Sequence, residues 1–124
     1  MEKILCVDDD PSLLYLYNKE LSEDGYEVVM AKNGKEALVQ FEKKKPRVVV
    51  LDICLPVMDG IETLNALLGK DRQAEVILNT SYLQHKDNFL TWGAAAYVVK
   101  SCDLGGLKQK IHEILQERKK PPEP

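Results

Sequence analysis

Five short apolar runs are spaced along the chain, and each one ends at a polar residue. The middle run, residues 48–51, holds four aliphatic side chains without a polar break, and Asp52 follows it directly. A short, continuous, β-branched run of this kind is typical of a strand buried on both faces of a parallel sheet. On the same reasoning, the other runs predict strands at residues 3–7, 26–31, 75–79 and 95–99.

The segments between the strands carry apolar residues at helical spacing, with residues that favour helix ends at their borders. Asp10 followed by Pro11 predicts the N-cap and first position of a helix that Gly25 is expected to end. Asn33 predicts the N-cap of the next helix, with Glu36 three residues later as its capping-box partner.

Three more helices are predicted. Gly60 is expected to begin the first and Gly69 to end it, a less regular one is expected at about residues 87–92, and Asp103 should cap the last. Strands that alternate with helices predict an α/β fold, (βα)5, with helices on both faces of a doubly wound, five-stranded parallel sheet. We expect one domain over residues 1–119, and a frayed tail or linker stub at residues 120–124.

Composition and charge exclude several classes of protein. The 124 residues include 44% apolar side chains and carry a formal net charge of −3, which argues against nucleic-acid binding by bulk charge. No apolar run is long enough to span a membrane, and the first residues lead into a strand without signal-peptide architecture. Three cysteines without metal-site spacing predict reduced thiols in a cytoplasmic protein: Cys6, Cys54 and Cys102.

Residues suited to phosphate chemistry stand where the predicted strands end. They are Asp8, Asp9 and Asp10 after the first strand, Asp52 after the third, Thr80 after the fourth and Lys100 after the fifth. The carboxyl ends of parallel strands share one edge of the sheet, where ligands bind in this fold class. Two carboxylates about 4 Å apart repel by about 4 kcal/mol at an effective dielectric of about 20, so such a cluster needs a cation. Oxygen ligands without His or Cys suit Mg²⁺ or Ca²⁺, and Mg²⁺ is the better match to a few carboxylates and a phosphate.

Each of these residues also has an ordinary structural explanation when it is taken alone. The acidic run can be a helix N-cap with extra acids, Thr80 a hydroxyl at a strand end, Lys100 a surface lysine and Asp59-Gly60 a turn. Their joint placement at successive strand ends favours a phosphoryl-transfer site. In such a site an aspartate oxygen is the nucleophile, and a metal, a lysine and a hydroxyl stabilise the phosphoryl oxygens.

Four segments, in this order and spacing, resemble the receiver domain of two-component response regulators. They are residues 4–11 (ILCVDDDP), 50–60 (VLDICLPVMDG), 80–81 (TS) and 93–100 (GAAAYVVK). The resemblance covers essentially the whole chain and implies a flavodoxin-like sheet with strand order 2-1-3-4-5. It also implies a signalling domain of a phosphorelay, not an enzyme with a separate substrate, that catalyses only its own phosphorylation and slow self-dephosphorylation.

The resemblance assigns the acidic residues to phosphoryl acceptance and metal binding. Asp52 is implied to accept a phosphoryl group from a phosphohistidine on a sensor kinase or phosphotransfer protein. Asp9 is implied to bind Mg²⁺ directly and Asp8 mostly through water, and Asp52 and the backbone carbonyl of Cys54 are further ligands. Asp10 is expected to act as the helix cap and not as a primary ligand.

The resemblance also implies a switch. Lys100 would pair with the phosphoryl group, Thr80 would move to hydrogen-bond it, and Tyr97 would swing inward with Thr80. Phosphorylation adds about −1.5 to −2 charges and three acceptor oxygens, which can bias a two-state element. The fourth helix, fifth strand and last helix would form the output surface for an effector protein or domain, with homodimerisation through this surface left open. No direct nucleic-acid binding and no membrane binding is expected.

The sequence departs from the family pattern at several positions. Ser101 follows Lys100 where the family generally has proline, and because a cis bond to a non-proline residue costs about 2.5–4 kcal/mol, we predict a trans bond there. Cys54 and Tyr82 occupy positions that tune phosphoryl lifetime, and neither suits the orientation of attacking water, so we predict slow self-dephosphorylation. Two large aromatics fall on the expected fourth helix, as a partner patch or as core: Phe89 and Trp92.

Two other functions fit part of this pattern. A haloacid-dehalogenase-like phosphatase also uses an Asp nucleophile with Mg²⁺, and Asp8 and Asp10 have its DxD spacing, but Ser12 matches its motif poorly. A pseudo-receiver would bind partners without phosphorylation, and the complete set of acidic, hydroxyl and lysine residues argues against it.

Overall fold

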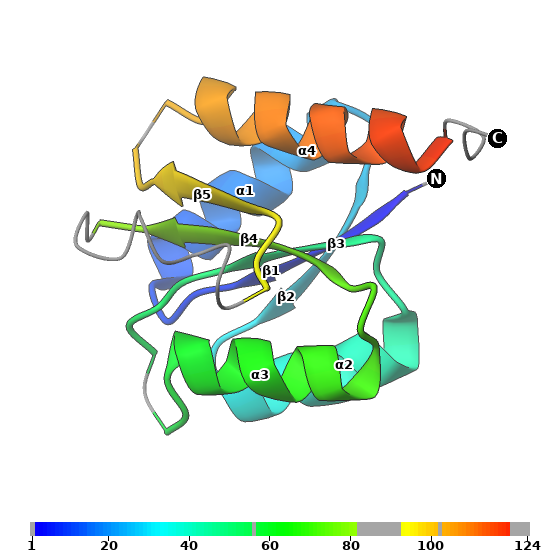
Figure 1. Cartoon of the computed structure of the whole chain (residues 1–124). Helices are drawn as coiled ribbons and strands as arrows, with labels where there is room; N and C mark the ends of the chain where they lie inside the picture. The colour runs from blue at the N-terminus through cyan, green and yellow to red at the C-terminus, as the bar shows by residue number, and fades with distance from the viewer. Residues whose placement is uncertain (1, 56, 82–92, 102, 120–124) are drawn as a thin grey trace, which may run out of the picture.

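The computed structural model of the chain describes residues 2–55, 57–81, 93–101 and 103–119. Within them, five strands form one parallel sheet in the order β2-β1-β3-β4-β5, which confirms the predicted fold. Helices cover both faces of the sheet, so the molecule has three layers (Figure 1). The elements are β1 (Lys3–Val7), α1 (Pro11–Glu23), β2 (Glu27–Ala31), α2 (Gly34–Lys44), β3 (Val48–Leu51), α3 (Gly60–Lys70), β4 (Glu75–Thr80), β5 (Ala96–Val99) and α4 (Gly105–Lys119).

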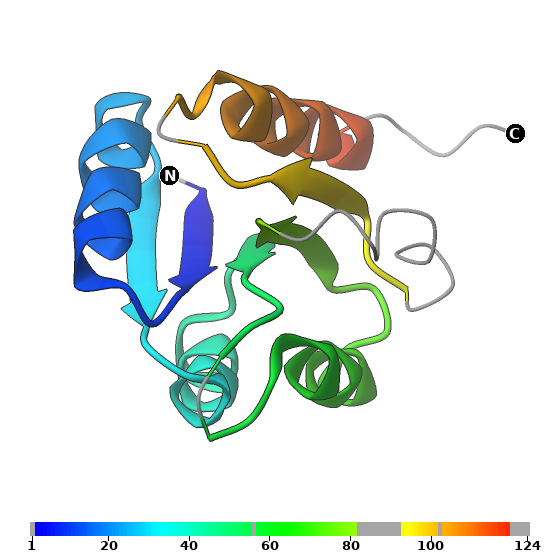
Figure 2. The same ribbon diagram turned by 90° about the vertical axis from the view of Figure 1, so that its left-hand side faces the viewer.

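The alternation of side chains along the buried strands divides the core into two clusters. In β1, Ile4 and Cys6 pack on the side of the sheet covered by α1 and α4, whereas Leu5 and Val7 pack on the side covered by α2 and α3. Successive side chains of a strand point to opposite faces, and both faces of this sheet are covered by helices (Figure 2). The middle of each strand is therefore apolar on both faces, and the charged and amide side chains lie at the strand ends, such as Lys3, Glu27 and Glu75.

The N-caps of the first two helices follow the sequence prediction, with one change. Asp10 accepts a hydrogen bond from the backbone N–H of Ser12, and Asn33 accepts one from Glu36. Glu36 does not return its side chain to Asn33, as a capping box requires, but accepts the N–H of Lys32 at 3.2 Å. The carboxylate still satisfies a backbone donor at the helix entrance.

The prediction that Gly69 ends a helix is wrong. Gly69 lies inside α3, which continues to Lys70, and the backbone N–H of Asp71 closes the last turn by donating to Leu67. A glycine near the end of a helix is tolerated at a cost of about 1 kcal/mol, so it marks an end only where the backbone turns left-handed. The described peptide bonds contain no cis bond, so the Lys100–Ser101 bond is trans, as predicted.

Several sequence predictions fall outside the described residues. These are the less regular helix at about 87–92 with Phe89 and Trp92, the residue Tyr82, and the tail at 120–124.

Candidate functional site

Three aspartates converge where β1 and β3 end side by side. Val7 pairs with Leu51 across the two strands, and the N–H of Asp52 donates to the carbonyl of Val7 at 3.2 Å. One carboxylate oxygen each from Asp8, Asp9 and Asp52 lies within 4.8 Å of the others. Asp8 and Asp52 are only 1% and 5% exposed, whereas Asp9 faces solvent. The sheet changes winding direction between β1 and β3, which is the usual ligand position in a doubly wound fold.

Lys100 supplies the positive charge that the carboxylates require. Its Nζ lies 2.7 Å from Asp8 Oδ2 and 2.8 Å from Asp52 Oδ2, so one ammonium group bridges the two buried acids. The Lys100 backbone N–H donates to the carbonyl of Thr80 at 2.9 Å, which places the lysine directly after β5. The structure therefore brings together residues separated by more than ninety positions in the sequence, in the arrangement predicted from the strand ends.

Burial and ion pairing shift the pKa values of Asp8 and Lys100 in opposite directions. Burial raises the pKa of Asp8 above its usual value, although hydrogen bonds from Lys100 and from the backbone of Asp10 work to lower it. Burial alone would lower the pKa of Lys100, but its hydrogen bonds to Asp52 and Asp8 outweigh that effect and raise it. The lysine is therefore held firmly in its charged form, while the site as a whole has an excess of negative charge.

Backbone contacts fix the two buried carboxylates. The N–H of Asp10 donates to Asp8 Oδ1 at 2.9 Å, and the N–H of Cys54 donates to Asp52 Oδ1 at 3.3 Å. Gly60 packs so closely against Asp52 that no side chain fits there. A Cβ at this position would lie 2.2 Å from the Asp52 carbonyl oxygen. The sequence marked Gly60 as a helix start, but its closeness to the central aspartate is visible only in three dimensions.

The remaining predicted residues lie around this cluster. Thr80 is fully buried at the end of β4, next to β3. Tyr97 on β5 is half-buried against the core cluster on the α2 and α3 side, and burial raises its pKa. The side chain of Cys54 is exposed beside the site.

A buried polar pair near the site was not predicted. Asn79 Nδ2 donates to Tyr17 Oη at 2.8 Å, joining β4 to α1. The two side chains are 4% and 2% exposed, and this bond satisfies polar atoms that would be costly to bury alone. An Asn at the end of an otherwise apolar run and a Tyr on the apolar face of a helix were the available signals, but nothing in the sequence pairs them.

The donor set fits a hard divalent cation. The three carboxylates offer oxygen atoms only. In Asp8 and Asp52 one oxygen accepts a backbone N–H and the other contacts the Lys100 ammonium group, so a cation would use the remaining lone pairs of these oxygens and those of Asp9. Mg²⁺ prefers such oxygen ligands and keeps several waters, which the exposed side of Asp9 allows. In the described part of the chain, no helix is long and apolar enough to cross a membrane.

Comparison with known proteins agrees with this geometry. Residues 4–112 match the response regulator receiver domain family. The probable transcriptional regulator ycf27 of Porphyra purpurea is 37% identical over 121 residues, which cover 96% of this chain but 49% of ycf27. Sporulation initiation phosphotransferase F of Bacillus subtilis is 34% identical over 116 residues, covering 92% of this chain and 94% of that protein. The chain thus spans about half the length of some curated relatives and nearly all of another.

Solved structures show the same fold. The response regulator TrrA of Thermotoga maritima, in complex with Mg²⁺–BeF, is 38% identical with a TM-score of 0.86, covering 92% of this chain and 99% of that chain. A CheY-like receiver domain protein of Methanospirillum hungatei is 33% identical with a TM-score of 0.88, covering 95% and 96%. TrrA in complex with the histidine kinase ThkA matches with 39% identity and a TM-score of 0.85, covering 93% and 99%. With this fold, this cluster of acids and this family match, the chain belongs to the response regulator receiver domains.

Proposed function

We propose that this domain accepts a phosphoryl group on Asp52 from a phosphohistidine of a sensor kinase or phosphotransfer protein. The observation that carries the proposal is the Lys100 bridge between Asp8 and Asp52, at the centre of a carboxylate cluster. The match to TrrA, solved in complex with a histidine kinase, supports a kinase as partner.

Mg²⁺ is the proposed cofactor. Asp9 and Asp52 would hold it directly, Asp8 mostly through water, and the carbonyl of Cys54 would complete the protein's ligands. Bound there, Mg²⁺ would neutralise charge on the phosphoryl oxygens. The clustered carboxylate oxygens and the Mg²⁺–BeF complex of TrrA support this assignment.

The transfer needs few parts from the protein. An Asp52 carboxylate oxygen attacks phosphorus, and the P–N bond to the histidine breaks with its electron pair leaving on the imidazole. Lys100 already lies 2.8 Å from Asp52 Oδ2, so its ammonium can follow the phosphoryl oxygens without a large backbone movement. The Cys54 N–H continues to orient the carboxylate through Oδ1, and Thr80 provides a hydroxyl at the neighbouring strand end.

The phosphoryl group would then shift the domain toward its output state. Thr80 would move toward it, Tyr97 would turn inward, and the surface that includes β5 and α4 would change its affinity for an effector. Names such as transcriptional regulator among the relatives support an effector partner. The comparisons give no support to a haloacid-dehalogenase-like phosphatase.

Mg²⁺-dependent labelling tests the proposal. Wild type incubated with acetyl phosphate should gain the mass of one phosphoryl group in MgCl₂ and none in EDTA. Asp52→Asn should abolish the gain, whereas Asp71→Asn, at an exposed aspartate on the opposite edge, should label normally. Labelling that survives Asp52→Asn would contradict the assignment of the phosphoacceptor.

Slow self-dephosphorylation is part of the same proposal. The exposed thiol of Cys54 stands beside Asp52 in place of an acid or amide that could orient water. We expect the phosphorylated domain to persist for minutes or longer at neutral pH and Cys54→Glu to shorten its lifetime. A wild-type lifetime of seconds would show that the thiol does not limit hydrolysis.

A further inference from the structure

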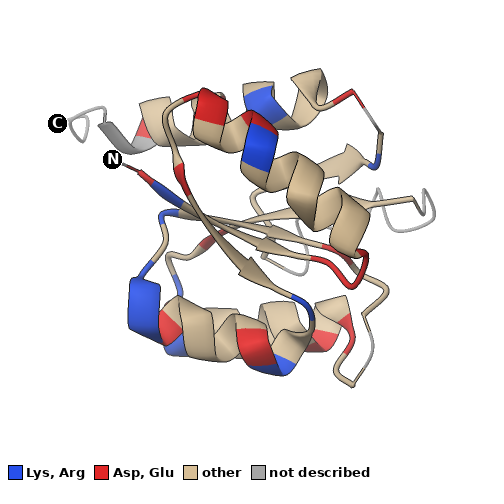
Figure 3. Ribbon diagram, turned by 180° about the vertical axis from the view of Figure 1, so that it is seen from behind, with Lys and Arg blue, Asp and Glu red and all other residues tan. Residues whose placement is uncertain are grey.

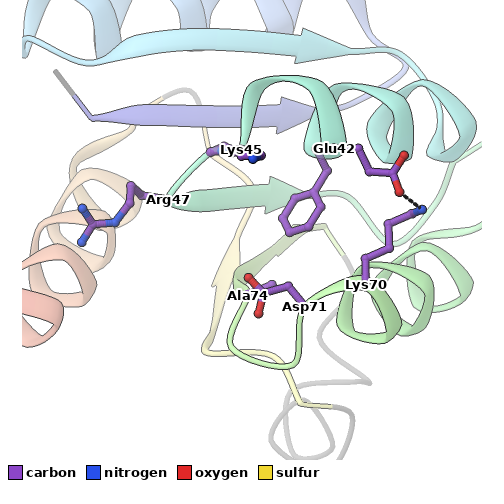
Figure 4. A pocket seen from close by; sticks show the side chains of 8 residues that line it. Glu42, Lys45, Arg47, Lys70, Asp71 and Ala74 are labelled. Atoms are coloured by element: carbon purple, nitrogen blue, oxygen red, sulfur yellow. Dashed lines mark hydrogen bonds and ion pairs between the residues drawn. The ribbon is translucent and has the colours of Figure 1, made fainter.

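Two adjoining hollows lie at the end of the sheet opposite to the aspartate cluster. One, of about 450 Å³, opens between the C-terminal ends of α2 and α3 (Figure 4). The other, of about 500 Å³, lies between the end of α2 and the start of β1. Lys45 and Arg47 line both hollows, so the two adjoin at these residues. Together they present six cationic side chains, here called the basic edge: Lys3, Lys43, Lys44, Lys45, Arg47 and Lys70.

The basic edge opposes the charge of the rest of the chain. Its hollows contain three acids, of which Glu2 pairs with Arg47 at 3.1 Å, Glu42 pairs with Lys70, and Asp71 is the third. Six cations against three acids leave +3 here, so the rest of a chain with net charge −3 carries −6. Basic segments gather at this end of the ribbon and an acidic loop lies at the other (Figure 3).

The negative end of the α2 dipole does not account for this excess. Lys43 and Lys44 stand in the last turn of α2, where about half a negative charge from the dipole favours cations. That half charge leaves an excess above about +2, and Lys3 and Arg47 come from other elements. Among the described residues, Lys43, Lys44 and Lys45 form no ion pair.

Two hydrogen bonds connect the residues that line the hollow beside β1. Arg47 N–H donates to the carbonyl of Lys3 at 2.9 Å, and Lys3 Nζ donates to the carbonyl of Lys44 at 3.3 Å. Lys45 adopts a left-handed conformation with φ 51°, where glycine or asparagine is favoured, and Pro46 follows. Lys45 lines both hollows from this turn, although its backbone conformation is one that glycine or asparagine adopts more readily.

We propose that the basic edge binds a compact polyphosphate, with its phosphates in the hollow beside β1. Lysine is a flexible point charge that suits phosphate oxygens, and five of the six cations are lysines. A concave site of about 500 Å³ suits a small polyanion better than the long, convex backbone of a nucleic-acid duplex. The adjoining hollow, walled by Phe41 with Glu42 and Asp71 as acceptors, is where a nucleoside attached to the phosphates would lie (Figure 4).

Titration of the ¹⁵N-labelled domain with sodium tripolyphosphate in EDTA tests the proposal, because EDTA keeps metal chelation out of the result. We expect saturable shifts of the backbone amides of residues 3, 43–45 and 47. A triple Lys→Gln variant at Lys43, Lys44 and Lys45 should weaken binding at least tenfold. The matched control removes three lysines elsewhere, Lys19, Lys108 and Lys110, and should change affinity less than threefold. Thermal unfolding of both variants verifies that each is folded.

Each outcome has a definite meaning. Equal losses in the two triple variants would overturn the proposal, because the binding would then follow net charge and not this surface. Duplex DNA binding at these lysines without tripolyphosphate binding would also overturn it and assign the surface to nucleic acid. ATP that binds more tightly than tripolyphosphate would identify a nucleotide as the source of the phosphates. Equal affinities would identify a free polyphosphate, and both results support the proposed site.

Discussion

Replacing Lys100 by methionine tests how the carboxylate cluster is held together. The lysine Nζ contacts Asp8 and Asp52 at 2.7 and 2.8 Å, and each contact is worth roughly 6 kcal/mol of attraction at an effective dielectric of about 20. The carboxylate oxygens lie within 4.8 Å of one another, so each pair repels by at least roughly 3.5 kcal/mol at the same dielectric. Methionine keeps most of the side-chain volume and removes only the charge, so the variant leaves this repulsion without its counterion.

The measured loss of folding stability will be smaller than these Coulomb energies, because removal of the lysine also removes the cost of burying an ammonium group. Its side chain is 17% exposed, and removal of one partner from a largely buried pair costs on the order of 3–5 kcal/mol. At roughly 3–5 °C per kcal/mol for a domain of this size, we expect the metal-free melting temperature to fall by about 10–25 °C.

The loss of stability in Lys100→Met should be smaller at acidic pH, and the variant should bind Mg²⁺ more tightly than the wild type does. Burial already raises the pKa of Asp8, and loss of Lys100 should raise it further. An acid whose folded pKa exceeds its unfolded pKa destabilises the fold as pH rises through the folded value, so the deficit should shrink toward acidic pH. The variant should also bind Mg²⁺ at least tenfold more tightly, or about 1.4 kcal/mol, since no ammonium competes for the carboxylates.

Differential scanning fluorimetry in EDTA and in MgCl₂, with calorimetric titration of Mg²⁺, measures all three effects. Lys108→Met is the matched control, because Lys108 also bridges two acids, Glu20 at 3.5 Å and Asp24 at 3.4 Å, but on the surface. Exposed pairs contribute about 0–1 kcal/mol, so the control should lose only a few degrees. Equal losses in the two variants, or weaker Mg²⁺ binding by Lys100→Met, would refute the electrostatic reasoning.

Three further predictions concern the frame around the site. Gly60→Ala should destabilise the fold by several kcal/mol and slow the proposed phosphorylation, since its Cβ would meet the backbone of Asp52 and Ile53. Gly69→Ala in the same helix has open space around it and should gain about 0.5–1 kcal/mol of stability, and urea unfolding compares the two variants. Tyr17→Phe should cost about 1–3 kcal/mol in the same assay by leaving a buried amide donor without its acceptor. Iodoacetamide at pH 8 should alkylate exposed Cys54 and spare buried Cys6, whose pKa burial raises to about 12, until the protein unfolds; peptide mass spectrometry follows both.

The parts of the site that could be predicted depend on regular geometry. Parallel strands bring their carboxyl ends to one edge, so acids and a lysine placed directly after apolar runs had to meet there. Contacts that depend on how side chains pack across layers gave no such signal. The bond between Asn79 and Tyr17 joins residues 62 positions apart, and the closeness of Gly60 to the Asp52 carbonyl depends on the path of a loop. The rule that glycine ends a helix also failed at Gly69, because continuing a helix through a glycine near its end costs little more than ending it there.

The separation of charge along the sheet has a cause in the fold itself. In a parallel α/β domain the helices begin at the carboxyl edge of the sheet, so Asp10 and Asp59 cap α1 and α3 on the side of the aspartate cluster. The positive helix ends there stabilise acids and phosphate, and the negative ends at the opposite edge favour lysines. The dipoles account for the direction of this polarity but supply only about half a charge each. The +3 at the basic edge exceeds what a helix dipole favours, and the polyphosphate proposed to bind there has the complementary charge, as Mg²⁺ does for the aspartate cluster.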